Sequence, residues 1–150
     1  KIIGGNFRLD ALQAAMIKEK IPFLDETTRI RQANAHFYST GFKELGLENL
    51  ITLPKIASGS FHIFNQYIIR APDRDELKAF LTSHDIETEI YYPVPLHLQE
   101  CFAYLDYKKG DFPESEQASQ ETLALPVYPG LTKNMQQYVM ECIKAFYIKS

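Results

Sequence analysis

The sequence is poor in the features that define several classes of protein. Its two cysteines, Cys101 and Cys142, have neither CxxC spacing nor a nearby pair of histidines, which argues against a disulfide framework or a zinc site and favours a reduced, cytoplasmic protein. No apolar run approaches the roughly 20 residues that a membrane-spanning helix needs. The net charge of -3 gives the chain no overall attraction for nucleic acid or an anionic membrane, so we expect neither as a partner.

The motifs of many common enzymes are also missing. There is no phosphate-binding GxxxxGK[ST] or GxGxxG, no GxSxG and no HExxH. The four histidines are dispersed, and none has a partner at helical or strand spacing, so we expect no metal site. What remains is a chain of 150 residues with 45% hydrophobic and 23% charged residues, the composition and size of one globular domain covering residues 1–150.

The first third of the chain has the pattern of helix. Apolar residues at helical spacing follow Asp10, whose carboxylate suits the N-cap position. Pro22 lacks an amide hydrogen and clashes with the preceding turn, which predicts a break there. The helical pattern resumes over residues 26–45 and ends at Gly46.

The rest of the chain mixes strands and shorter helices. The run of aromatic and β-branched residues at 61–70 predicts the main strand, and residues 88–92 predict a short one. Asp73 and Glu76 have the spacing of a capping box that would open a short helix. Two further helices are predicted, one from Pro113 through residue 124 and one after Thr132 as its cap.

This order of elements predicts an α+β domain. We expect a small, mostly antiparallel sheet with helices on one face and a long N-terminal helix. The residues alone leave its role open between part of an enzyme, a free-standing binding or regulatory module without catalysis, and a dimerisation module held by the long helix.

Two short segments concentrate side chains suited to binding. The stretch from Tyr91 to His97 combines tyrosines, two prolines and a histidine, and is either a functional loop or an ordered loop whose aromatic rings pack on the sheet. Gly4-Gly5-Asn6 is the other segment. Glycines permit close backbone approach and an asparagine amide can donate to an anion such as phosphate, but the same residues also suit a plain turn.

Five segments of the sequence resemble one family, the DegT/StrS aminotransferases. They occur in the family's order and spacing over nearly the whole chain, which makes the resemblance specific. The segments are GNFRLDALQAA (residues 5–15), QYIIR (66–70) followed by DRDEL (73–77), IYYPVPLHLQ (90–99), GDFPESE (110–116) and LALPVYP (123–129).

The resemblance implies the C-terminal small domain of a fold-type-I enzyme that depends on pyridoxal 5'-phosphate (PLP). Such enzymes are usually homodimers and move an amino group, typically from glutamate, onto a keto carbon of a nucleotide-linked sugar. In the family the lysine that binds PLP lies in a large domain, in a motif of the type SFxxxKxxxxGEGG, which does not occur here. We therefore expect that the large domain lies outside this chain, that the chain contains no catalytic residue, and that alone it is inactive and does not bind PLP.

The resemblance also assigns roles to individual residues. Asn6 matches the asparagine that reaches the PLP phosphate of the partner subunit. Tyr91 and His97 match a loop that lies near the sugar-nucleotide site. Asn65 stands where many members have a histidine, and an amide forms hydrogen bonds but cannot act as an acid or base near neutral pH.

Overall fold

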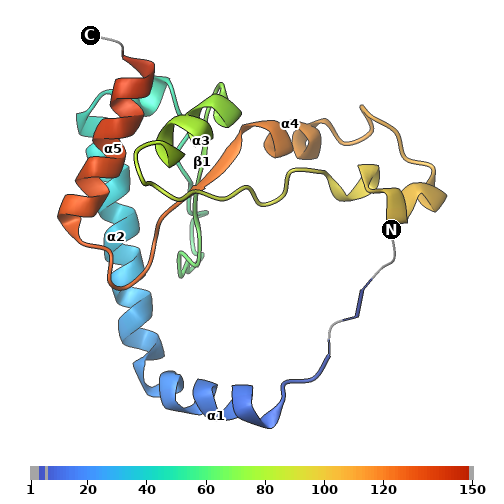
Figure 1. The fold of residues 1–150 in the computed structure, drawn as a ribbon, viewed down its shortest axis with the longest axis horizontal. Helices are drawn as coiled ribbons and strands as arrows, with labels where there is room; N and C mark the ends of the chain where they lie inside the picture. The colour runs from blue at the N-terminus through green and yellow to red at the C-terminus, as the bar shows by residue number, and fades with distance from the viewer. Residues whose placement is uncertain (1–3, 6, 149–150) are drawn as a thin grey trace.

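The computed structural model describes residues 4–5 and 7–148. It consists of a packed body and two extensions (Figure 1). The body contains the sheet and the helices packed around it. The N-terminal arm, residues 7–23, leads away from the body at one end, and the loop arm, residues 93–112, leads away at another.

The N-terminal helices follow the local signals. Helix α1 (Ala11–Lys20) begins at Asp10, whose Oδ1 accepts a hydrogen bond from the Gln13 amide at 2.8 Å, which confirms the predicted N-cap. A 3₁₀ turn, η1 (Ile21–Phe23), contains Pro22 and separates α1 from α2 (Leu24–Glu44), which confirms the predicted break. After α2, Gly46 has a φ of 71° that suits glycine, and η2 (Leu47–Asn49) follows.

The sheet has two antiparallel strands, β1 (Tyr67–Arg70) and β2 (Thr122–Leu125). Tyr67 pairs with Leu125 and Ile69 with Leu123, so these four side chains share one face, and all of them are buried. Isolated bridges widen the sheet on both sides, one between residues 52 and 70 and one between residues 89 and 124.

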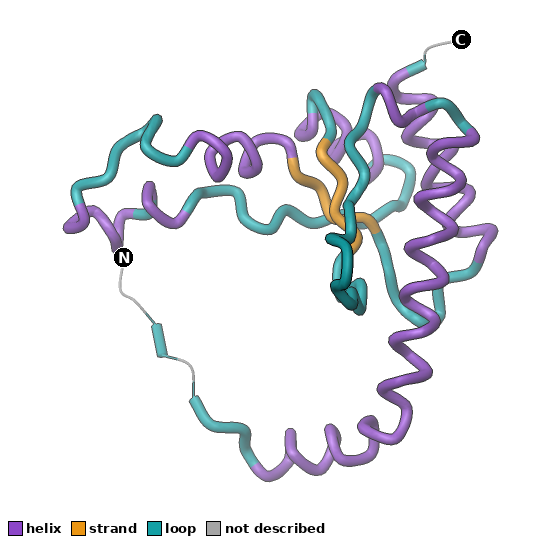
Figure 2. The backbone as a smooth tube through the Cα atoms, turned by 180° about the vertical axis from the view of Figure 1, so that it is seen from behind, coloured by secondary structure: helices purple, strands orange, loops and turns teal. Residues whose placement is uncertain are grey.

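The long helices cover the buried face of this sheet. Helix α5 (Lys133–Tyr147) lies beside α2 (Figure 2), and the rings of Tyr38 on α2 and Tyr67 on β1 lie 5.1 Å apart. Thr132 caps α5 as predicted, because its Oγ1 accepts from the Met135 amide at 3.3 Å. Helix α3 (Arg74–Thr82) packs against α5 and β2. The predicted α+β class is therefore confirmed.

Three predicted elements differ in extent. Of the strand expected over 88–92, only the bridge of residue 89 with residue 124 forms. The strand expected over 61–70 covers only 67–70, because Phe64 has a φ of 50° and the chain bends at residues 65 and 66. The helix expected over 113–124 ends earlier: α4 spans Pro113–Glu121, and Thr122 begins β2. At Thr122 the backbone is extended, and the side chain of Leu123 is fully buried in the core, so strand pairing prevails over continued helix.

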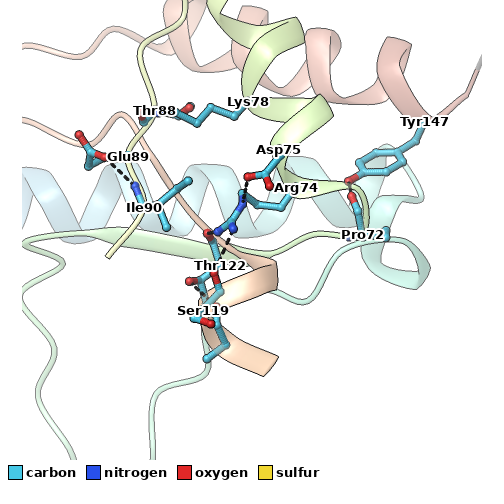
Figure 3. A network of polar contacts seen from close by, with 11 residues as sticks. Pro72, Arg74, Asp75, Lys78, Thr88, Glu89, Ile90, Ser119, Thr122 and Tyr147 are labelled. Atoms are coloured by element: carbon cyan, nitrogen blue, oxygen red, sulfur yellow. Dashed lines mark hydrogen bonds and ion pairs between the residues drawn. The ribbon is translucent and has the colours of Figure 1, made fainter. Parts of the chain in front are cut away.

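The capping box expected at Asp73 is wrong. Asp73 has a left-handed backbone conformation and its side chain accepts no hydrogen bond at the start of α3. The next residue carries the structural role instead. The buried Arg74 guanidinium donates to the carbonyls of Thr122 (2.8 Å) and Ser119 (2.9 Å) and to Asp75 (2.7 Å), which joins α3 to α4 and β2 (Figure 3).

The N-terminal arm contrasts with this packed body. Helix α1 contains no buried residue, although it carries apolar side chains such as Leu12 and Met16.

Within the described residues, none of the helices combines the length and the apolar character needed to cross a bilayer.

Candidate functional site

A groove of about 760 Å³ opens between α3, α5 and the segments that flank β2. Tyr91, Tyr128 and Tyr138 line it with half-exposed rings. Tyr138 is held in place because its hydroxyl donates to the carbonyl of His84 at 3.3 Å. The groove thus presents aromatic surface to solvent beside polar groups.

The charged lining of this groove is mainly acidic. Asp85, Glu87 and Glu89 contribute carboxylates, and Lys78 is the lysine among the lining residues. The Lys78 ammonium donates to the carbonyl of Thr88 at 2.5 Å, so it ties α3 to the neighbouring segment (Figure 3). An anionic ligand would meet three carboxylates here and one cation that is already engaged.

The second feature is a buried pair of side chains at the base of the loop arm. His97 lies in the 3₁₀ turn η3 (Leu96–Leu98), and Glu116 lies in the first turn of α4. The Nε2 atom of His97 is 3.0 Å from Oε1 of Glu116, and their side chains are 7% and 11% exposed. The ring of Phe112 packs on the imidazole, with ring centroids 4.8 Å apart.

Glu116 also binds the turn that precedes α4. The amide of Gly110 donates to the same Oε1 at 2.7 Å. The hydrogen bond from this amide is the largest cause of the lowered pKa of the Glu116 carboxyl. Partial burial opposes the lowering, and hydrogen bonds from His97 and the Phe112 amide add to it. The carboxylate therefore connects two parts of the loop arm, His97 and Gly110, to helix α4.

The structure separates the residues that the sequence singled out. Tyr91 lines the groove, whereas His97 contacts Glu116 and Phe112 outside that lining. Asn6 lies outside the described residues. The roles of all three in binding stay predictions.

Glu116 is a functional candidate that the fold reveals and the sequence motifs did not single out. The sequence contains one indication of its importance, because Glu116 is the last residue of the GDFPESE segment that resembles the family. A glutamate in the first turn of a helix has an ordinary explanation in the helix dipole, and only the fold shows that it faces a histidine 19 residues away.

Asn65 and its neighbour His62 also separate in the structure. Asn65 lines the groove. His62 lines a smaller cavity of about 280 Å³ against α2, and its Nδ1 accepts a hydrogen bond from the Phe64 amide at 2.9 Å. His62 therefore serves to shape its own turn.

The groove by itself does not fit PLP. The cofactor phosphate needs a set of N–H donors or cations, and its aldehyde needs a free lysine amine. The groove offers carboxylates, and its lysine is hydrogen-bonded to a backbone carbonyl.

Comparison with known proteins places the fold in one class. The chain superposes with a TM-score of 0.85 on the crystal structure of S. venezuelae DesV in complex with a ketimine intermediate, at 30% identity, covering 97% of this chain and 38% of that one. The fold of this chain is thus that of one part of a larger protein, about two fifths of the DesV chain.

The chain belongs to the DegT/DnrJ/EryC1/StrS aminotransferase family, which it matches over residues 1–144. It is 49% identical to a "Pleiotropic regulatory protein" of Geobacillus stearothermophilus, over 97% of this chain and 39% of that protein. It is 35% identical to a dTDP-3-amino-3,4,6-trideoxy-alpha-D-glucose transaminase of Micromonospora megalomicea subsp. nigra, over 94% and 38%. The chain spans less than two fifths of the curated relatives that it matches, and the family resemblance in its sequence is confirmed.

Proposed function

We propose that this chain is the C-terminal small domain of a PLP-dependent aminotransferase that transfers an amino group from glutamate to a nucleotide-linked keto sugar. The observation that carries the proposal is the superposition of 97% of the chain on 38% of DesV, and the 35% identity to a dTDP-sugar transaminase over 94% of the chain supports the sugar substrate. The ketimine in that structure is an adduct typical of PLP chemistry, which supports PLP as the cofactor of the whole protein.

In this proposal the domain contributes positioned side chains rather than the reactive group. His97 and the loop arm are fastened to the body through Glu116, and Tyr91 lies at the edge of the groove. We propose that these two residues face the sugar nucleotide and that Asn6 donates to the PLP phosphate of the partner subunit in a homodimer. The chain's composition supports a cytoplasmic enzyme.

The test uses the full-length protein encoded by the gene and the 150-residue chain in parallel. We expect the full-length protein to be yellow, with an absorption band at the visible edge that borohydride removes, and to transfer an amino group from glutamate to a nucleotide keto sugar. The chain alone should stay colourless with added PLP and show no turnover. A well-folded, colourless and inactive full-length protein would support the alternative, a non-catalytic binding, regulatory or dimerisation module.

The proposed role of Asn6 is tested in the full-length protein by Asn6→Ala. Loss of one amide donor to the phosphate should weaken cofactor retention during dialysis while circular dichroism stays unchanged. Asn34→Ala is a control, because its amide donates to the carbonyl of Tyr128 within the body. Unchanged retention in Asn6→Ala would remove Asn6 from the site.

A further inference from the structure

The pairing of His97 with Glu116 constrains the chemical form of the histidine. Both side chains are about nine-tenths buried, so water does not compete strongly for either group. An ionised carboxylate can only accept hydrogen bonds. Because the Glu116 oxygen lies 3.0 Å from Nε2, the hydrogen of this contact must be on the imidazole nitrogen.

Glu116 is held in its accepting form and position by other contacts. The Gly110 amide donates to the same oxygen at 2.7 Å, and the carboxylate lies in the first turn of α4, where the helix dipole favours negative charge. The lowered pKa of Glu116 agrees with this geometry. These contacts hold the acceptor oxygen in place beside the imidazole.

The imidazole is fixed on its face as well as on its edge. Phe112 packs against the ring at 4.8 Å with an interplanar angle of 56°. Among the described residues, the second ring nitrogen, Nδ1, has no hydrogen-bond partner. A neutral His97 that donates from Nε2 keeps a lone pair on Nδ1, and that lone pair can accept a hydrogen bond.

We propose that Glu116 is a positioning residue that holds His97 as the Nε2–H tautomer and so presents Nδ1 as an acceptor for a hydroxyl group of the sugar substrate. This inference rests on the proposed function, in which His97 lies near the sugar nucleotide. Glu116 itself contacts no substrate in this arrangement, and it acts through the orientation and hydrogen position of the imidazole.

The first test measures the tautomer directly. Proton–nitrogen correlation NMR on the ¹⁵N-labelled 150-residue chain distinguishes the two ring nitrogens, and the His97 signals are assigned by their loss in His97→Gln. We expect the Nε2–H tautomer in the wild type under conditions where the ring is neutral. An Nδ1–H tautomer would overturn the proposal, and this measurement needs no variant of Glu116 to fold.

The second test changes the acceptor. In Glu116→Gln the amide can donate as well as accept, so the His97 signals should shift toward a mixture of tautomers. Glu114→Gln is the matched control, because Glu114 is an exposed glutamate in the same first turn. Unchanged His97 signals in a folded Glu116→Gln would overturn the proposal, as would equal shifts in Glu114→Gln.

The third test uses the full-length enzyme and separates this inference from the proposed function. We expect Glu116→Gln to lower kcat/KM for the keto sugar by about tenfold, the worth of one oriented hydrogen bond, with the half-reaction with glutamate unchanged. Glu114→Gln should leave both unchanged. A wild-type enzyme without transaminase activity contradicts the proposed function, whereas an active wild type matched by Glu116→Gln in both half-reactions contradicts this inference.

Discussion

Helices α1 and α5 begin with the same kind of N-cap hydrogen bond but differ in how much of each helix is buried. Asp10 caps α1 and Thr132 caps α5, each by accepting from the amide three residues later. Helix α5 then buries five residues against the body, whereas α1 buries none. Figure 1 shows α5 against α2 and α1 extending away from them.

The difference shows that a local cap can determine where a helix begins, whereas packing against the body determines how stable the helix is. A cap and good helix formers favour α1, but a helix of ten residues is marginal in water without packing. Its exposed Leu12 (68%) and Met16 (56%) are apolar side chains that the body leaves uncovered. We therefore expect the body to carry the chain's stability and the N-terminal arm to contribute little to it.

The largest expected effect tests the body. Leu123 on β2 is fully buried opposite Ile69, so Leu123→Ala removes core contacts and leaves a cavity. We expect the free energy of unfolding of the chain to fall by about 2–5 kcal/mol, measured by urea denaturation. A loss below about 0.5 kcal/mol, the size of an ordinary surface substitution, would mean that the body is not the cooperative unit.

The two caps give the next effect and compare the helices directly. Thr132→Ala should lower the free energy of unfolding by about 1 kcal/mol, because α5 is part of the body. Asp10→Ala should fray α1 and so reduce the helix signal in circular dichroism at 222 nm. The midpoint of the unfolding transition should stay unchanged. Equal shifts of the transition midpoint in both variants would contradict the separation of arm and body.

A pH titration tests how the loop arm is fastened. The folded-state pKa of Glu116 lies below the ordinary value of 4.5, so its stabilising contribution is fully present above that value and is lost as the pH falls through the folded pKa. The difference in unfolding free energy between the wild type and Glu116→Gln should therefore shrink on acidification below about pH 4.5. In Glu114→Gln, by contrast, we expect no such pH-dependent difference.

The smallest effect is expected in the N-terminal arm. Leu12→Ala removes a side chain that is 68% exposed, and alanine is the better helix former, so the free energy of unfolding should change by less than about 0.5 kcal/mol. Val139→Ala on α5 is the comparison, because Val139 is 3% exposed and should cost more. A large loss in Leu12→Ala would show that α1 packs on something in the isolated chain.

The elements that were predicted correctly depend on neighbours in sequence. The break at Pro22, the caps at Asp10 and Thr132 and the stop at Gly46 each follow from the properties of one residue and the next few amides. The elements that were missed depend on distant partners. The sequence predicted helix for residues 122–124, but pairing with β1 and burial of Leu123 make them part of a strand.

The features of the candidate site also fall into those that the sequence determines and those that depend on the fold. The sequence by itself determined the family, the α+β class and the segments that contain Tyr91 and His97, because these are properties of residue order. Only the tertiary structure decided that Tyr91 lines a groove, that His97 faces Glu116, and that Arg74 rather than Asp73 organises the start of α3. The physical reason is that burial and hydrogen bonding between residues far apart in sequence exist only once the chain has folded and water has been excluded from between them.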